Sequence, residues 1–161
     1  MIQLKVIIKV FYDVVNNSNN THVVDIGASK VSVKQDCLLY ATQPAAGFPA
    51  PGDDLVEKSL DLNDLLIDNP SATFFVKVQG DSMEGAKIFS GDVLVVDRSI
   101  TPVSGKVVVA AVYGEMVVKR LHKSADQVQL VSEQDGYDPI PITDNDDCFV
   151  WGVVVGCVRV I

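Results

Sequence analysis

Two side chains of this sequence could together break an acyl bond, and the first of them is Ser82. Ser82 lies in Gly80-Asp81-Ser82-Met83, directly after a segment that alternates like a β-strand. A serine in a tight turn at a strand end can project its hydroxyl into a cleft, although most such serines only cap or close the turn. The hydroxyl becomes an effective nucleophile when a base takes its proton.

The second side chain is Lys119, which follows the apolar run Met116-Val117-Val118. Taken alone, a lysine at a strand end is usually a solvated charge. It can act as a general base when it is neutral, and burial among apolar side chains lowers its pKa because burial disfavours the charged form. A Ser-Lys pair needs no histidine, which suits a chain with only His22 and His122. If Ser82 and Lys119 meet, they predict acyl-transfer chemistry.

A third segment of interest is residues 43–54, which contains the Ala46–Gly47 bond. Three prolines and two glycines within it exclude regular secondary structure. The segment is either a plain linker or an extended stretch that a peptidase could reach. Composition alone favours the linker.

Short strands are expected along most of the chain because apolar and polar residues alternate with a period of two. The segments are residues 2–11, 23–26, 31–33, 73–79, 93–96, 106–113, 115–121, 128–131, 140–142 and 149–160. Leu62, Leu65 and Leu66 have helical spacing, with Asp61 as a possible N-cap. Closely spaced short strands predict a mainly β body of sandwich or barrel type, with a hairpin around Gly114.

The composition argues against several classes of function. The chain has 161 residues, of which 48% are hydrophobic, and a formal net charge of −8. Residues 1–46 carry four lysines and three aspartates, so the acidic excess lies in residues 47–161. Neither part has the clustered Lys and Arg that neutralise phosphates, and we expect no direct sequence-specific nucleic-acid binding. No apolar run is long enough to cross a membrane, so we expect no membrane-spanning segment.

The cysteines and histidines offer little for a metal site. Cys37, Cys148 and Cys157 show no CxxC spacing, and there are only two histidines. We therefore expect reduced thiols, no metal and no cofactor, in a protein of the cytoplasm.

These segments together resemble the UmuD and LexA family of self-cleaving serine peptidases. The matching stretches occur in the family's order with near-matching spacing, and they are Gly47–Pro51, Ser71–Met83, Ile88–Asp97, Gly105–Leu121 and Trp151–Val154. The resemblance spans residues 43–161. It includes both Ser82 and Lys119.

The resemblance implies a compact β-strand peptidase domain with an N-terminal arm, and a role for each candidate residue. Ser82 would be the nucleophile, Lys119 the general base, and the backbone N–H groups of Asp81 and Ser82 the oxyanion donors. The Ala46–Gly47 bond would be the substrate. Ala46 is the LexA-like choice, whereas the best-known UmuD has cysteine there, and both residues suit a tight pocket. Cleavage would separate an arm, residues 1–46, from a peptidase and dimerisation domain, residues 47–161.

The resemblance also implies partners. Family members form homodimers and cut themselves when they bind a RecA filament on single-stranded DNA. In the UmuD branch the shortened product joins UmuC, a Y-family polymerase, for error-prone translesion synthesis in the SOS response to DNA damage. No helix-turn-helix pattern precedes residue 46, so the UmuD branch fits better than the LexA branch. Residues 1–35 match no part of the family.

Two alternatives remain open at this point. The fold could serve as a non-catalytic interaction or regulatory subunit in which Ser82 and Lys119 are idle. A processing enzyme of the signal-peptidase type would share the Ser-Lys chemistry, but it would need a membrane segment.

Overall fold

The computed structural model describes residues 20–28, 37–40, 56–143 and 147–161, which belong to two compact units. The described part of the first unit comprises residues 20–28, 69–143 and 147–161. That of the second unit comprises residues 37–40 and 56–68. Ser82, Lys119 and the described residues around them belong to the first unit.

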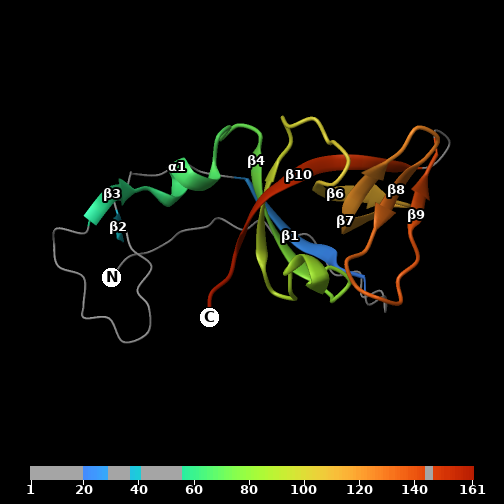
Figure 1. Ribbon diagram of the computed structural model, residues 1–161, viewed down its shortest axis with the longest axis horizontal. Helices are drawn as coiled ribbons and strands as arrows, with labels where there is room; N and C mark the ends of the chain where they lie inside the picture. Colours follow the sequence, from blue (N-terminus) through green and yellow to red (C-terminus); the bar gives the residue numbers. More distant parts are fainter. Residues whose placement is uncertain (1–19, 29–36, 41–55, 144–146) are drawn as a thin grey trace. The chain divides into compact units, whose positions relative to one another are not determined.

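The first unit is built around one sheet that closes on itself (Figure 1). Its strands are β1 (His22–Ala28), β4 (Thr73–Gln79), β5 (Val93–Asp97), β6 (Val107–Val112), β7 (Glu115–Lys123), β8 (Val128–Val131), β9 (Ile140–Ile142) and β10 (Cys148–Val158). They are ordered β1-β4-β5-β10-β6-β7-β8-β9, and β1 also pairs with β7. That extra pairing closes β1, β4, β5, β10, β6 and β7 into an antiparallel barrel. Closure pairs β1 with β7 and so covers two edges that an open sheet would present.

Two apolar clusters fill the first unit, and β7 contributes to both of them. Val118 belongs to the cluster that contains Val76 and Leu94, whereas Val117 and Leu121 belong to the other. Successive side chains of a strand point to opposite faces, so β7 is buried on both. A strand with two buried faces favours the valines that crowd this part of the sequence.

The expected mainly β fold is confirmed. Residues 73–79, 128–131 and 140–142 form strands with the expected bounds, and β6 and β7 form the hairpin around Gly114. Residues 23–26 lie inside the longer β1. The strands expected at residues 2–11 and 31–33 lie outside the described residues.

The second unit contains a two-stranded pairing and one short helix. Strands β2 (Cys37–Tyr40) and β3 (Val56–Leu60) are antiparallel, and α1 (Leu62–Leu66) follows β3. The carboxylate of Asp61 accepts a hydrogen bond from the Asn63 backbone N–H at 2.8 Å, so the predicted N-cap is confirmed. No helix within the described residues is long and apolar enough to span a membrane.

Candidate active site

The turn after β4 presents Ser82. The chain leaves β4 at Gln79 and passes through Gly80, whose φ of +112° suits glycine. It then enters a short 3₁₀ helix, η2 (Glu84–Ala86). Ser82 lies between Gly80 and η2 and has 0% of its surface exposed. A hydroxyl held in this way is fully removed from bulk water.

Strand β7 brings Lys119 to this turn. The Lys119 Nζ atom lies 2.7 Å from Ser82 Oγ, and the lysine is 1% exposed. Lys119 shares its face of β7 with Val117 and Leu121, both buried, because strand side chains alternate. The structure therefore brings together the two side chains that the sequence singled out, although 37 positions separate them.

Burial sets the protonation behaviour of Lys119. Desolvation lowers the pKa of Lys119 from 10.5 to about 8, and the nearby Asp81 carboxylate opposes this by raising it. The Tyr137 ring lies 5.4 Å from Lys119 Nζ, which also favours the ammonium form. Desolvation is the larger effect, so the neutral amine becomes accessible a little above neutral pH.

Two N–H donors surround the Ser82 hydroxyl oxygen. Ser82 Oγ accepts from the backbone N–H of Thr21 at 2.8 Å and from Lys119 Nζ at 2.7 Å. Lys119 Nζ also donates to Asn20 Oδ1 at 3.0 Å. Once Lys119 has lost a proton, its lone pair can accept the Ser82 proton over the same short distance, so the geometry would allow Lys119 to serve as a base for Ser82. Ser82 and Lys119 are referred to below as the dyad.

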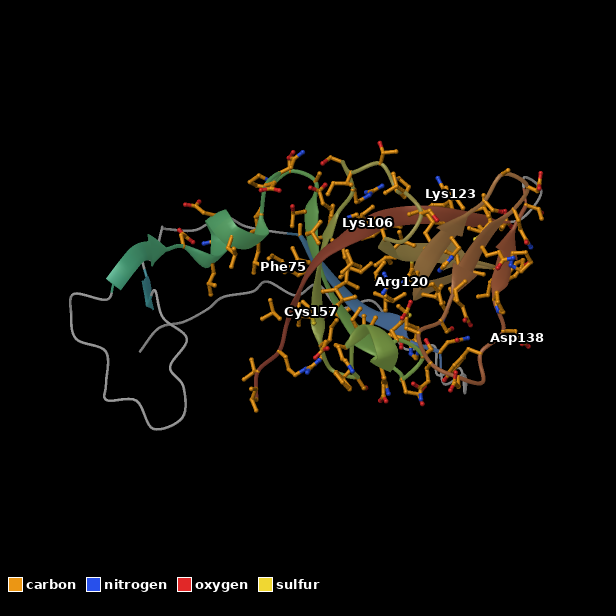
Figure 2. All side chains as sticks on the ribbon, in the orientation of Figure 1. Phe75, Lys106, Arg120, Lys123, Asp138 and Cys157 are labelled. Carbon is orange, nitrogen blue, oxygen red and sulfur yellow. The ribbon has the colours of Figure 1, made fainter. Side chains whose placement is uncertain are left out.

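A loop after β8 holds the serine turn in place. The Glu133 N–H donates to the Ser82 carbonyl oxygen at 2.8 Å, and the Gly85 N–H donates to the Glu133 carbonyl at 2.7 Å. Glu133 also pairs with Arg120, the neighbour of Lys119 on β7, and Figure 2 labels Arg120 there. These contacts fix Ser82 and Lys119 relative to one another. Glu133 was not expected from the sequence, since nothing in its local pattern points to the serine turn.

Tyr137 and Asp81 form a further contact beside the dyad. The Tyr137 hydroxyl donates to the Asp81 carboxylate. Desolvation raises the pKa of Tyr137 to about 12, and the Asp81 carboxylate adds to this effect, so the phenol stays neutral through the working range of Lys119. Tyr137 was also missed in the sequence.

Strand β1 supplies the last residues around the dyad. His22 pairs with Gln79 of β4 and with Val117 of β7, so β1 lies between β4, which leads into the Ser82 turn, and β7, which carries Lys119. Thr21, directly before β1, is fully buried. Its carbonyl accepts from the Val118 N–H at 3.0 Å. The sequence predicted the strand but not its place beside Ser82.

Two expected features of the site stay predictions. The Ala46–Gly47 bond lies outside the described residues. The backbone N–H groups of Asp81 and Ser82 lie in the serine turn, and their role as oxyanion donors stays a prediction. Within the described residues, no group of three His, Cys, Asp or Glu side chains could hold a metal ion.

A second buried ionisable residue, Asp92, is paired with Arg159. Both carboxylate oxygens of Asp92 accept from the guanidinium of Arg159 at 2.6 Å, and the Phe89 N–H donates to the same carboxylate at 2.8 Å. The hydrogen bond from Arg159 lowers the pKa of Asp92 to about 2. The Cys157 thiol donates to the Asp92 carboxylate at 3.4 Å, and Figure 2 labels Cys157.

The fold is that of a serine peptidase of the LexA and UmuD type, and comparison with known proteins agrees. Residues 38–155 match the family described as Peptidase S24-like, and the chain belongs to this family. It is 38% identical to protein MucA of Salmonella typhimurium over 128 residues, which cover 80% of this chain and 86% of MucA.

Two further relatives support the assignment. Protein ImpA of Escherichia coli is 48% identical over 83 residues, covering 52% of this chain and 57% of ImpA. The LexA repressor of Thiobacillus denitrificans is 35% identical over 123 residues, covering 76% of this chain and 61% of the repressor. The resemblance to the UmuD and LexA family is therefore confirmed.

Proposed function

We propose that this protein is a self-cleaving serine peptidase that cuts its own Ala46–Gly47 bond. The observation that carries the proposal is the distance of 2.7 Å between Ser82 Oγ and Lys119 Nζ in a site from which water is excluded. A buried lysine without a carboxylate bonded to its ammonium group serves stability poorly, because desolvation of its charge costs free energy. It serves catalysis well, because the same desolvation supplies a neutral base.

The reaction is acyl transfer. Neutral Lys119 takes the Ser82 proton as Ser82 Oγ attacks the Ala46 carbonyl carbon, and the Asp81 and Ser82 backbone N–H groups stabilise the oxyanion. Lys119 then gives the proton to the Gly47 nitrogen as the peptide bond breaks. Water, deprotonated by Lys119, hydrolyses the Ser82 ester and frees the Ala46 carboxylate. The products are residues 1–46 and 47–161.

The shortened product would act in the SOS response. We propose that a RecA filament on single-stranded DNA stimulates the cut by favouring the state in which the scissile bond reaches Ser82. Residues 47–161 would then serve as an accessory subunit of a UmuC-like, Y-family translesion polymerase. The similarity to MucA over most of both chains supports this branch.

A homodimer is proposed as the working form. The C-terminal half of β10 pairs with β5, whereas only the first half pairs with β6. Val155 and Val158 in that half are 46% and 40% exposed. Apolar side chains along a strand with an unpaired edge favour association with a second copy. Light scattering at micromolar concentration tests this, and a monomer there would contradict it.

The alternative function is a non-catalytic subunit of the same fold. The specific feature against it is the burial of Lys119, which is 1% exposed with its Nζ 2.7 Å from Ser82 Oγ, because an idle lysine gains nothing from burial beside a serine hydroxyl. Incubation of the purified chain with RecA, single-stranded DNA and a nucleoside triphosphate separates the two proposals. Mass spectrometry should show residues 1–46 and 47–161 as the products. An intact chain, or a cut at another bond, would contradict the assignment.

A further inference from the structure

The segment that enters β1 lies directly on the candidate nucleophile. Ser82 Oγ accepts a hydrogen bond from the Thr21 N–H at 2.8 Å, and Lys119 Nζ lies 3.0 Å from Asn20 Oδ1. Position 80 shows how close the approach is, since a side-chain carbon on Gly80 would lie 2.4 Å from the Asn20 carbonyl oxygen. The peptide bond between Asn20 and Thr21 thus occupies the space over the dyad.

This peptide bond is docked in a pose that cannot react. An N–H donates along its own bond, so Ser82 Oγ lies near the plane of the Asn20–Thr21 peptide, on its N–H side. Attack on a carbonyl carbon requires the oxygen to approach from above the peptide plane. The Asn20 carbonyl also accepts from His22 Nδ1 at 2.8 Å, so it is engaged by its own strand.

The docking is specific and involves both catalytic strands. Thr21 is fully buried, and its carbonyl accepts from the Val118 N–H of β7 at 3.0 Å. Residues 22–28 pair with β4 from Gln79 to Phe74, and Val23 and Ile26 pack on the apolar core beneath. An extended peptide that adds to a sheet in this way is held through its backbone, as strand-binding partners are.

We infer that residues 20–28 act as a built-in inhibitory strand, which occupies the Ser82–Lys119 dyad and must leave before the Ala46–Gly47 bond can enter. This inference rests on the proposed self-cleavage. Two peptide bonds cannot lie over one hydroxyl, so the two segments of the same chain compete for it.

The docking also has features that favour release. Thr21 Oγ1 is buried without a hydrogen-bond partner among the described residues, which costs free energy. The β1–β4 register shifts at Val24, so the ladder is interrupted near its start. A strand that is specific but imperfectly satisfied is suited to reversible docking.

A reversible lock tests the inference in the full-length chain. Asp25 and Lys77 are directly paired across β1 and β4; Lys77 is exposed and Asp25 is half-buried. The double variant Asp25→Cys, Lys77→Cys should form a cross-strand disulfide with diamide and lose it with dithiothreitol. Each single cysteine variant, treated identically, controls for the native thiols. Because the lock is removable, a folding defect would be visible in the reduced sample.

Two readouts are followed on the same samples. A fluorophosphonate probe reacts with an accessible, activated serine by forming an Oγ–P bond and expelling fluoride, and it does not depend on the Ala46–Gly47 bond. The rate of self-cleavage at pH 9 reports on the proposed reaction. We expect oxidation to slow both by about tenfold or more, the effect of stabilising a blocking contact by somewhat over 1 kcal/mol. Reduction should restore both. Equal rates in the oxidised and reduced forms would overturn the inference.

A second pair of variants and a binding measurement keep the two proposals separable. Thr21→Pro removes the N–H that bonds Ser82 and should speed labelling several-fold, whereas Thr21→Val keeps the N–H, removes the unsatisfied hydroxyl and should slow it. Suppose that Thr21→Pro labels faster and Thr21→Val more slowly than the wild type, but the Ala46–Gly47 bond is not cleaved. This result would support the inhibitory strand and reject the proposed substrate. If Ser82 never labels, the proposed function fails, and hydrogen exchange decides the inference. Protected β1 amides that lose protection in Thr21→Pro support it, and unprotected β1 amides in the wild type overturn it.

Discussion

Lys119 and Asp92 are two buried ionisable residues of the same barrel, exposed by only 1% and 2%, and the protein treats them in opposite ways. Asp92 has the guanidinium of Arg159 bonded to both carboxylate oxygens, so its pKa falls to about 2 and it stays charged. Within the described part of the chain, Lys119 has only neutral oxygen atoms, from Ser82 and Asn20, within hydrogen-bonding distance, so desolvation lowers its pKa to about 8 and its charge is easily lost.

The difference separates a structural charge from a chemical one. A counter-ion keeps a buried group in its charged form and ties two segments together. The absence of a bonded counter-ion leaves desolvation dominant, and the group then titrates where a base is useful. The two regions therefore predict opposite consequences for substitution, with activity lost in one and stability lost in the other.

The largest expected effect is on the catalytic side of this comparison. Ser82→Ala should lower self-cleavage by about a thousandfold or more, because no other hydroxyl is bonded to Lys119 in the described residues. Its free energy of unfolding should change by less than about 1 kcal/mol, since little volume is lost. Fragment yield and denaturant unfolding measure the two. Continued cutting by a clean Ser82→Ala sample would remove Ser82 from the mechanism.

The next effect concerns the stability cost of burying Lys119. Lys119→Met should stabilise the fold. The pKa of Lys119 drops from 10.5 to about 8 on folding, so between these pH values the unfolded chain binds more protons and stability rises with pH. At pH 7 the buried ammonium thus costs up to about 3 kcal/mol, which methionine avoids. Denaturant unfolding should show a gain at pH 7 that shrinks towards pH 10.5. A variant that is less stable at both pH values would contradict this account.

Arg159→Ala should have the opposite effect on stability and should destabilise the fold. It leaves the Asp92 carboxylate buried without its guanidinium partner, which should lower the free energy of unfolding. The pair's stabilisation is present above about pH 4 and is lost as pH falls through about 2, because the pKa of Asp92 is lowered by folding. The double variant Asp92→Asn, Arg159→Ala is the control and should recover part of the loss. The folded fraction should keep its cleavage rate, and a loss of cleavage at full folding would break the comparison.

The smallest expected effect concerns Cys157. Desolvation raises the pKa of the Cys157 thiol to about 11, and the hydrogen bond to Asp92 adds to it. The thiol should therefore alkylate slowly at pH 8 although the residue is exposed. Asp92→Asn should speed alkylation by iodoacetamide a few-fold, and mass spectrometry of the Cys157 peptide measures it. An unchanged rate would show that Asp92 does not set the state of this thiol.

The strands and the two residues of the dyad could be predicted from the sequence because the patterns that indicate them are short-range. Alternation over residues 73–79 and the apolar run before Lys119 are short-range patterns, and the family resemblance singled out Ser82 and Lys119 among many serines and lysines. The residues that surround the dyad leave no such pattern. Thr21 and Glu133 reach Ser82 through backbone groups, from 61 positions before it and from the loop after β8. Any residue type offers a backbone N–H, so only the closed barrel reveals them.

The same limit applies to the pairing of Asp92 with Arg159. Arg159 lies 67 positions after Asp92, in a segment that the sequence presented only as an apolar strand. Pairing of β10 with β5 brings the two together. Which residue pairs with a buried charge therefore depends on the order of the strands in the sheet. The alternation of apolar and polar residues along a strand does not specify that order.

The most direct test of the central claim is the yield of the two fragments against pH, without RecA, for the wild type and for Lys119→Arg. If neutral Lys119 is the base, wild-type cleavage should rise with pH through about 8 and level off above it, because the amine fraction saturates. Asp81 and Tyr137 face the same lysine, and the Tyr137 phenol stays neutral over this range. Lys119→Arg should not cut at any pH tested, since guanidinium keeps its proton. An arginine variant that still cuts faster as pH rises would contradict the account.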